Sequence, residues 1–154
     1  MKHVELVSKT VEQTIEIATI IGKNLEGGEV VELVSDVGGG KTTFVRGLAK
    51  GAGSKSHVSS PTFTISKVYK TPDFEIVHFD FYRLDEAGLI EYEIQEAVFD
   101  PKTVIVVEWS DVVKHVLPQD RLIINITNGH DEKRVFNLSF PTEMEYLVDG
   151  ISED

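Results

Sequence analysis

The stretch from Ser35 to Phe44 carries residues that could bind phosphate. It reads Ser-Asp-Val-Gly-Gly-Gly-Lys-Thr-Thr-Phe, and it departs only at its first position from the phosphate-binding pattern of Gly, four residues, Gly-Lys and then Ser or Thr. In that pattern Lys41 reaches the β- and γ-phosphates and the Thr42 hydroxyl binds a magnesium ion. The sequence therefore predicts a nucleotide site. Ser35 would be strained only if the turn needs a positive φ.

Two acidic residues stand at the ends of apolar stretches. Asp80 follows "EIVHF" and Glu108 follows "TVIVV". A phosphoryl-transfer site needs carboxylates that hold magnesium and place a water molecule. We expect both residues to do this, with the strand before Glu108 lying beside the strand before the loop. The alternatives are that either acid caps a helix or pairs with an arginine, such as Arg83 near Asp80.

The segment "SSPTFT" is a third candidate for contact with nucleotide. A threonine on a loop after the first nucleotide-binding helix can sense the γ-phosphate in switch proteins, which would give Thr62 this role. Taken alone, Ser-Pro-Thr is merely a turn that enters a strand.

Hydrophobic periodicity indicates the elements that position these residues. An amphipathic helix is expected over 10–25, with Val11, Ile15, Ala18, Ile21 and Leu25 on one face. Further helices are expected over 42–52, 88–98 and 110–117, and strands over 3–7, 29–35, 62–70, 74–83, 103–109, 120–127 and 133–140. The predicted fold class is α/β, a P-loop NTPase-like three-layer domain with a mixed central sheet.

Length and composition bound the remaining possibilities. The 154 residues, 41% of them hydrophobic, suit one domain over 1–154 that ends in an acidic tail at about 142–154. No apolar run approaches the ~20 residues of a membrane span, and the N-terminus lacks the features of a signal peptide. We therefore expect a cytoplasmic protein. The absence of cysteine excludes disulfides and thiolate chemistry.

The net charge of −11 is concentrated in the second half of the chain. Residues 1–70 carry nine basic and seven acidic side chains, whereas residues 71–154 carry six and nineteen. Such a protein repels a phosphate backbone, so strong direct nucleic-acid binding is not expected. The stretch 85–100 has six acidic residues and no Lys or Arg. This stretch could dock a basic partner or could simply be a solvated helix face.

Four motifs taken together resemble one family. "VGGGKTTFVRGL", "SSPTFTISKVY", "HFDFYRL" and "VVEWSD", in this order, resemble the bacterial TsaE (YjeE) family of small P-loop ATPases of tRNA threonylcarbamoyladenosine (t6A) biosynthesis. The likeness runs from about Glu29 to Arg121. It implies a slow, magnesium-dependent ATPase that acts on a threonylcarbamoyl-transferase complex of the TsaD–TsaB type rather than on tRNA directly.

The resemblance also implies site residues. Catalytic roles fall to Lys41, Asp80 and Glu108, and magnesium ligation to Thr42, Asp80 and Glu108. The positions expected to contact ATP are Asp36, Gly38, Gly39, Gly40, Lys41, Thr42, Thr43 and Thr62. The family usually has "GDLGAGKTT", so Ser35 replaces a glycine and Gly39 replaces an alanine.

Three other nucleotide-dependent functions share the phosphate-binding loop. In a small-molecule kinase Arg83 or Arg121 would clamp the acceptor, but the chain has only four arginines and no arginine-rich lid. A GTPase would need the Asn-Lys-x-Asp segment that reads guanine, and it is absent. A third possibility, an interaction module whose nucleotide state sets its conformation, merges with the family interpretation.

Overall fold

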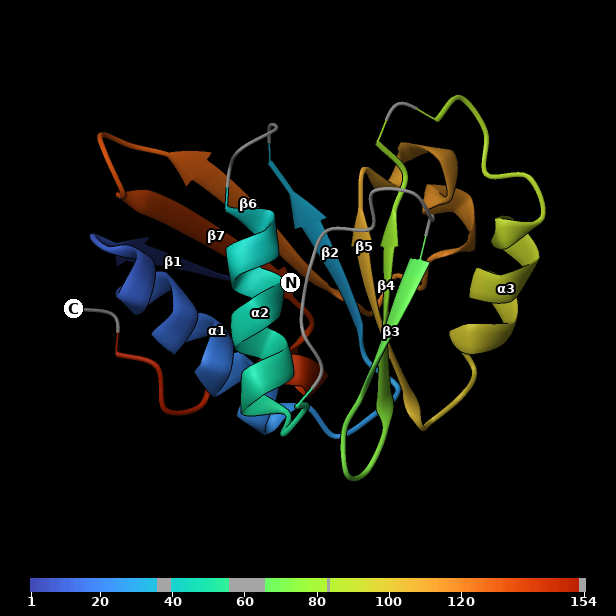
Figure 1. Ribbon diagram of the computed structural model, residues 1–154, viewed down its shortest axis with the longest axis horizontal. Helices are drawn as coiled ribbons and strands as arrows, with labels where there is room; N and C mark the ends of the chain where they lie inside the picture. Colours follow the sequence, from blue (N-terminus) through green and yellow to red (C-terminus); the bar gives the residue numbers. More distant parts are fainter. Residues whose placement is uncertain (36–39, 56–65, 83, 153–154) are drawn as a thin grey trace.

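A computed structural model describes residues 1–35, 40–55, 66–82 and 84–152. Seven strands form one mixed sheet in the order β1-β7-β6-β2-β5-β4-β3 (Figure 1). The strands are β1 (Lys2–Ser8), β2 (Val30–Val34), β3 (Ser66–Lys70), β4 (Glu75–Asp80), β5 (Thr103–Glu108), β6 (Leu122–Asn128) and β7 (Arg134–Phe140). The central neighbours β6, β2, β5 and β4 are parallel, and the outer pairs are antiparallel. The α/β fold with a mixed sheet is confirmed.

Helices lie on both sides of this sheet. They are α1 (Val11–Asn24), α2 (Lys41–Gly51) and α3 (Ile90–Ala97), with the 3₁₀ turns η1 (Ser110–Val112), η2 (Lys114–Val116) and η3 (Thr142–Val148). Helices α1 and α2 share one hydrophobic cluster with one face of the sheet, and α3, η1 and η2 share a second cluster with the other face. Figure 1 shows α3 well apart from the α1–α2 pair.

The expected central strand is buried throughout. Every residue of β5 is buried, as an apolar β-branched run between two helical layers requires. The expected helix over 110–117 is wrong. Trp109 has φ 55° and Val113 has φ −128°, so the chain makes two separate 3₁₀ turns before Pro118.

Helices α1 and α2 approach closely because glycines line their contact. A Cβ atom on Gly22 would lie 2.2 Å from the carbonyl oxygen of Leu48, and one on Gly51 would lie 2.0 Å from that of Thr19. These distances leave no room for a side chain, so the two backbones are in contact. The first turn of α1 is capped by Thr10, whose hydroxyl accepts from the N–H of Gln13 at 3.1 Å.

The end of the described chain packs on α1. The expected acidic tail begins with η3, in which Met144 and Leu147 are buried. Asn24 donates to the carbonyl oxygens of Leu147 and Asp149 at 3.0 and 2.9 Å. Among the helices of the described segments, none has the length and apolar composition that crossing a membrane would require.

Candidate functional site

The candidate residues meet at one edge of the sheet. Strands β2, β5 and β4 are parallel neighbours, so their carboxyl ends lie together, and the register pairs Asp80 directly with Glu108. Helix α2 begins at Lys41 beside the same edge (Figure 1). This is the place where parallel α/β sheets bind ligands. The predicted adjacency of the strands before the loop and before Glu108 is confirmed.

Lys41 is buried and lies against the end of β2. Its Nζ donates to the carbonyl oxygen of Ser35 at 3.0 Å and to the Ser35 hydroxyl at 3.3 Å. The same ammonium lies 4.6 Å from the centroid of the Trp109 ring, within the range of a cation–π contact. The ammonium group is thus held between β2 and β5.

The replacement of glycine by Ser35 costs no backbone strain. Within the described segments, the non-glycine residues with positive φ are Trp109 and Asp131, so Ser35 does not require a conformation that favours glycine. The serine instead supplies an oxygen to Lys41 that glycine lacks.

Glu108 is bound to a histidine that the sequence analysis did not single out. Its Oε2 atom is hydrogen-bonded to Nε2 of His78, and both side chains are buried. Nδ1 of His78 has no partner among the described residues. The alternation of β4 and β5 places His78, Asp80 and Glu108 on the face covered by α2, because Ile76 and Val106 of the same phase pack in the α1–α2 cluster.

Asp80 is half-buried and close to several charges. Its Oδ1 accepts from the N–H of Tyr82 at 3.0 Å. Burial raises the pKa of the Asp80 carboxyl above its usual value, and the Glu108 carboxylate raises it further, while the Tyr82 hydrogen bond, His78 and Lys41 oppose the shift. A cation placed between Asp80 and Glu108 would relieve this repulsion. The alternative partner Arg83 lies outside the described residues.

Trp109 closes the site on the β5 side. It adopts the left-handed conformation with φ 55° and ψ 55°, which is strained for a bulky residue. The Tyr82 ring lies against it with centroids 4.9 Å apart and ring planes tilted by 39°, so Trp109 contacts both Tyr82 and Lys41. The single tryptophan of the chain, directly after Glu108, is the local signal that marks this position.

Arg134 approaches the start of α2 from the opposite side. A Cβ atom on Gly40, which has φ 94°, would lie 3.5 Å from Nε of Arg134. Its Nη1 donates to the carbonyl oxygens of Asp131 and Lys133 at 3.1 and 2.9 Å. No carboxylate of the described segments forms an ion pair with it. No local motif marks Arg134, because only the β7 register brings it to α2.

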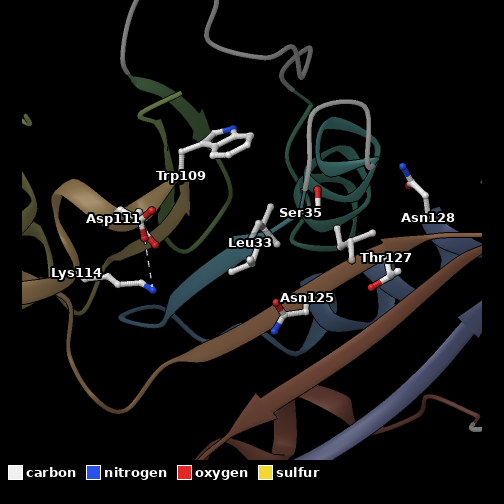
Figure 2. Close-up of a pocket in the computed structure, with 11 residues that line it drawn as sticks. Leu33, Ser35, Trp109, Asp111, Lys114, Asn125, Thr127 and Asn128 are labelled. Carbon is white, nitrogen blue, oxygen red and sulfur yellow. Dashed lines mark ion pairs between the residues drawn. The ribbon is translucent and has the colours of Figure 1, made fainter. Parts of the chain in front are cut away.

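A cavity of about 440 Å³ adjoins Ser35 and Trp109 (Figure 2). Figure 2 shows Trp109, Asp111 and Lys114 on one side of it and Asn125, Thr127 and Asn128 of β6 on the other. Its walls therefore combine an aromatic ring with amide and hydroxyl groups, which suits a flat polar ligand or part of one.

Arg121, an acceptor clamp in the kinase alternative, is already engaged. Its Nε donates to Glu32 at 3.0 Å and its Nη1 to the carbonyl oxygen of Pro118 at 2.9 Å. Glu32 is buried and is also hydrogen-bonded to the Ser110 hydroxyl. Arg121 therefore serves to compensate a buried carboxylate between β2 and η1.

Not all the predicted site residues can be placed. Gly40, Lys41, Thr42 and Thr43 form the start of α2, and Asp80 and Glu108 lie beside Lys41. Asp36, Gly38, Gly39 and Thr62 lie outside the described residues. Within the described ranges no group of three His, Asp or Glu side chains could hold a metal ion. Mg²⁺ in phosphoryl-transfer sites uses one or two carboxylates together with phosphate and water, which the Asp80–Glu108 pair and the Thr42 hydroxyl fit.

Comparison with known proteins gives consistent matches. The model of the family described as "Threonylcarbamoyl adenosine biosynthesis protein TsaE" matches residues 8–136. The tRNA threonylcarbamoyladenosine biosynthesis protein TsaE of Bacillus subtilis is 35% identical over 157 residues, covering 99% of this chain and 96% of that protein. The protein of the same name from Rickettsia bellii is 35% identical over 141 residues, covering 90% and 96%. The crystal structure of Bacillus subtilis YdiB aligns with a TM-score of 0.74 and 32% identity, covering 95% of this chain and 91% of that one.

Proposed function

This chain belongs to the TsaE family, and from that premise we propose that it is a magnesium-dependent ATPase that supports t6A modification of tRNA. One observation carries the proposal: the buried Lys41 at the start of α2 lies at the same sheet edge as the carboxylates Asp80 and Glu108. Phosphoryl-transfer sites combine a cationic side chain that binds phosphate with carboxylates that bind a metal ion.

The roles follow from position and chemistry. Lys41 leaves the Ser35 carbonyl to neutralise phosphate charge, and the N–H groups at the start of α2 donate to phosphate oxygens. Thr42 and Asp80 would hold the metal, and Glu108 would orient the attacking water. Mg²⁺, when bound, neutralises charge on the transferred phosphoryl group. The cavity between Trp109 and β6 is open to a further part of the nucleotide.

The described part of the chain offers no arginine to the transition state at the carboxylate side of the site. No free arginine stands on the carboxylate side among the described residues, because Arg121 is bound to Glu32 and Arg134 lies across Gly40. An arginine that stabilises transition-state charge can accelerate such reactions by several orders of magnitude. Hydrolysis is therefore slow until a partner binds, and the partner is a threonylcarbamoyl-transferase complex of the TsaD–TsaB type. A protein with this task works in the cytoplasm with tRNA-modifying enzymes.

Calorimetry with MgATP and a phosphate-release assay test the proposal. Lys41→Ala should abolish measurable ATP binding, while far-UV circular dichroism shows a folded domain. Glu108→Gln should reduce hydrolysis by orders of magnitude with a smaller effect on binding, since it removes the charge and keeps the shape. Asp80→Asn should raise the magnesium concentration needed for half-maximal turnover. Wild-type affinity in Lys41→Ala, or turnover that requires a small phosphate acceptor, would refute the ATPase assignment.

A further inference from the structure

Helix α3 has apolar side chains on two opposite faces, and only one face is covered. Ile94 is fully buried, and Ile90, Ala97 and Val98 pack beside it in the second core cluster. On the other side Leu89, Tyr92 and Phe99 are 82, 62 and 85% exposed. We call these three residues the α3 outer stripe.

The spacing of the outer stripe makes it one continuous surface. At about 100° per residue, positions 89, 92 and 99 fall within a single face of the helix, opposite position 94. The α-helix ends at Ala97, and a turn carries the chain on to Phe99: the Val98 N–H donates to the Ile94 carbonyl at 2.9 Å and the Phe99 N–H to the Glu96 carbonyl at 3.3 Å. Large side chains gathered on one exposed face mark an interaction site, whereas scattered ones do not.

Negative charge surrounds the outer stripe. Glu93 and Glu96 are exposed and lie on the same face of α3, and Glu86 is exposed just before the helix. No cation of the described chain pairs with any of these three. Glu91 and Asp100 are engaged elsewhere, with His115 of η2 and with the turn at Lys102 and Thr103.

We infer that the α3 outer stripe is the docking surface for a protein partner that presents an apolar recess bordered by Lys and Arg side chains. Charge decides between the possible occupants. A second copy related by a two-fold axis would bring Glu93 and Glu96 of both copies together without compensating cations. An anionic membrane surface would be repelled in the same way. A basic protein surface satisfies both the apolar stripe and its acidic border.

The surface is joined closely to the nucleotide site. Only nine residues separate Asp80 from α3, and their start is fixed because Phe81 N–H donates to the Glu108 carbonyl at 3.1 Å. A partner seated on α3 is therefore tied to the carboxylate edge by a short segment. The inference rests on the proposed function, because it identifies that partner with the threonylcarbamoyl-transferase complex.

The test measures binding of the purified TsaD–TsaB type complex from the same organism by biolayer interferometry. One variant combines Leu89→Ser, Tyr92→Ser and Phe99→Ser, and its matched control combines Val7→Ser and Val11→Ser, which are exposed on β1 and α1. We expect affinity to fall about tenfold or more in the outer-stripe variant only, as for truncated aromatic anchors. Both variants should unfold at the wild-type temperature, because the side chains are exposed.

A second pair of variants tests the acidic border. Glu93→Lys with Glu96→Lys should slow association, and the wild-type association rate should fall as salt rises. Glu12→Lys with Glu16→Lys, which makes the same charge change on exposed positions of α1, should bind as the wild type does.

The outcomes separate the two proposals. Wild-type affinity in the outer-stripe variant overturns the docking surface and leaves the ATPase proposal intact. A dimer in sedimentation that the outer-stripe variant dissolves overturns the basic-partner assignment in favour of a second copy. If the wild type binds MgATP but not the complex, the assignment of the partner and that of its docking surface are both wrong. If the wild type binds neither, the proposed function fails as well.

Discussion

The buried contact between His78 and Glu108 should dominate how the site responds to mutation. We consider His78→Leu, which replaces the imidazole by an apolar side chain of similar volume. The side chains of His78 and Glu108 are 0 and 3% exposed, so the substitution leaves a carboxylate in the interior without its partner. Removing one member of a buried pair costs about 3–5 kcal/mol.

The reverse substitution and the double substitution give the rest of the cycle. Glu108→Leu leaves both ring nitrogens of His78 unpaired, since Nδ1 already has no partner in the described chain, and should cost about 2–3 kcal/mol. The double variant replaces the pair by apolar groups and should cost less than either single variant, because a buried pair is often no better than a well-packed apolar one.

Urea denaturation followed by far-UV circular dichroism measures these free energies of unfolding. For a domain of this size, 3 kcal/mol corresponds to a fall of roughly 6–12 °C in Tm. His78→Gln, which can still donate to the carboxylate, is the matched control and should recover part of the stability. A loss below about 1 kcal/mol in His78→Leu, or additive losses in the double variant, would show that the contact contributes little and that the reasoning is wrong.

Three further predictions concern the surroundings of the site. The pKa of Asp80 is raised in the folded protein, so the nucleotide-free protein loses stability as the pH rises from the ordinary aspartate pKa through the pKa of the folded state. Asp80→Asn should therefore have a higher Tm than the wild type at pH 7, and the difference should be much smaller below pH 3.8. An equal gain at both pH values would contradict this. Arg134→Gln should weaken the binding of ATP and of ADP by about tenfold each, as for a lost charge-assisted hydrogen bond. The control Arg46→Gln, at an exposed position of α2, should leave both affinities unchanged. Calorimetry that shows a loss for ATP alone would place Arg134 at the γ-phosphate. Gly51→Ala should lower the free energy of unfolding by more than about 2 kcal/mol, since its Cβ would lie 2.0 Å from the Thr19 carbonyl oxygen; chemical denaturation that finds wild-type stability would mean that the helices separate freely.

Local patterns were sufficient for the elements and for part of the site. The apolar run of β5 predicted a buried central strand, and the helix predicted from Thr42 begins one residue earlier, at Lys41. Both features depend on residues that are near in sequence. That β2 and β5 are neighbours also followed, because an acid after a buried strand is typical of the strand beside a phosphate-binding loop.

Contacts between residues far apart in the sequence could not be predicted from local patterns. The partner of Glu108 is His78, thirty residues away, and the pairing depends on the exact β4–β5 register. Arg121, which would clamp the acceptor only in the kinase alternative, is likewise paired with Glu32, at a separation of eighty-nine residues. The helix expected over 110–117 was wrong because Val113, with φ −128°, separates two short 3₁₀ turns, and no local pattern marks that break.

The glycine-lined contact between α1 and α2 fixes one side of the candidate site and leaves its other side able to move. Because backbone meets backbone at Gly22 and Gly51, α2 cannot slide or rotate on α1 without a clash, and Lys41 at its first position is held to the same frame. Among the described elements, Trp109, the carboxyl end of β4 and α3 lie outside this contact and are not held by it. Helix α2 therefore forms the fixed side of the candidate site. Trp109 and the carboxyl end of β4 form the side that the contact does not hold.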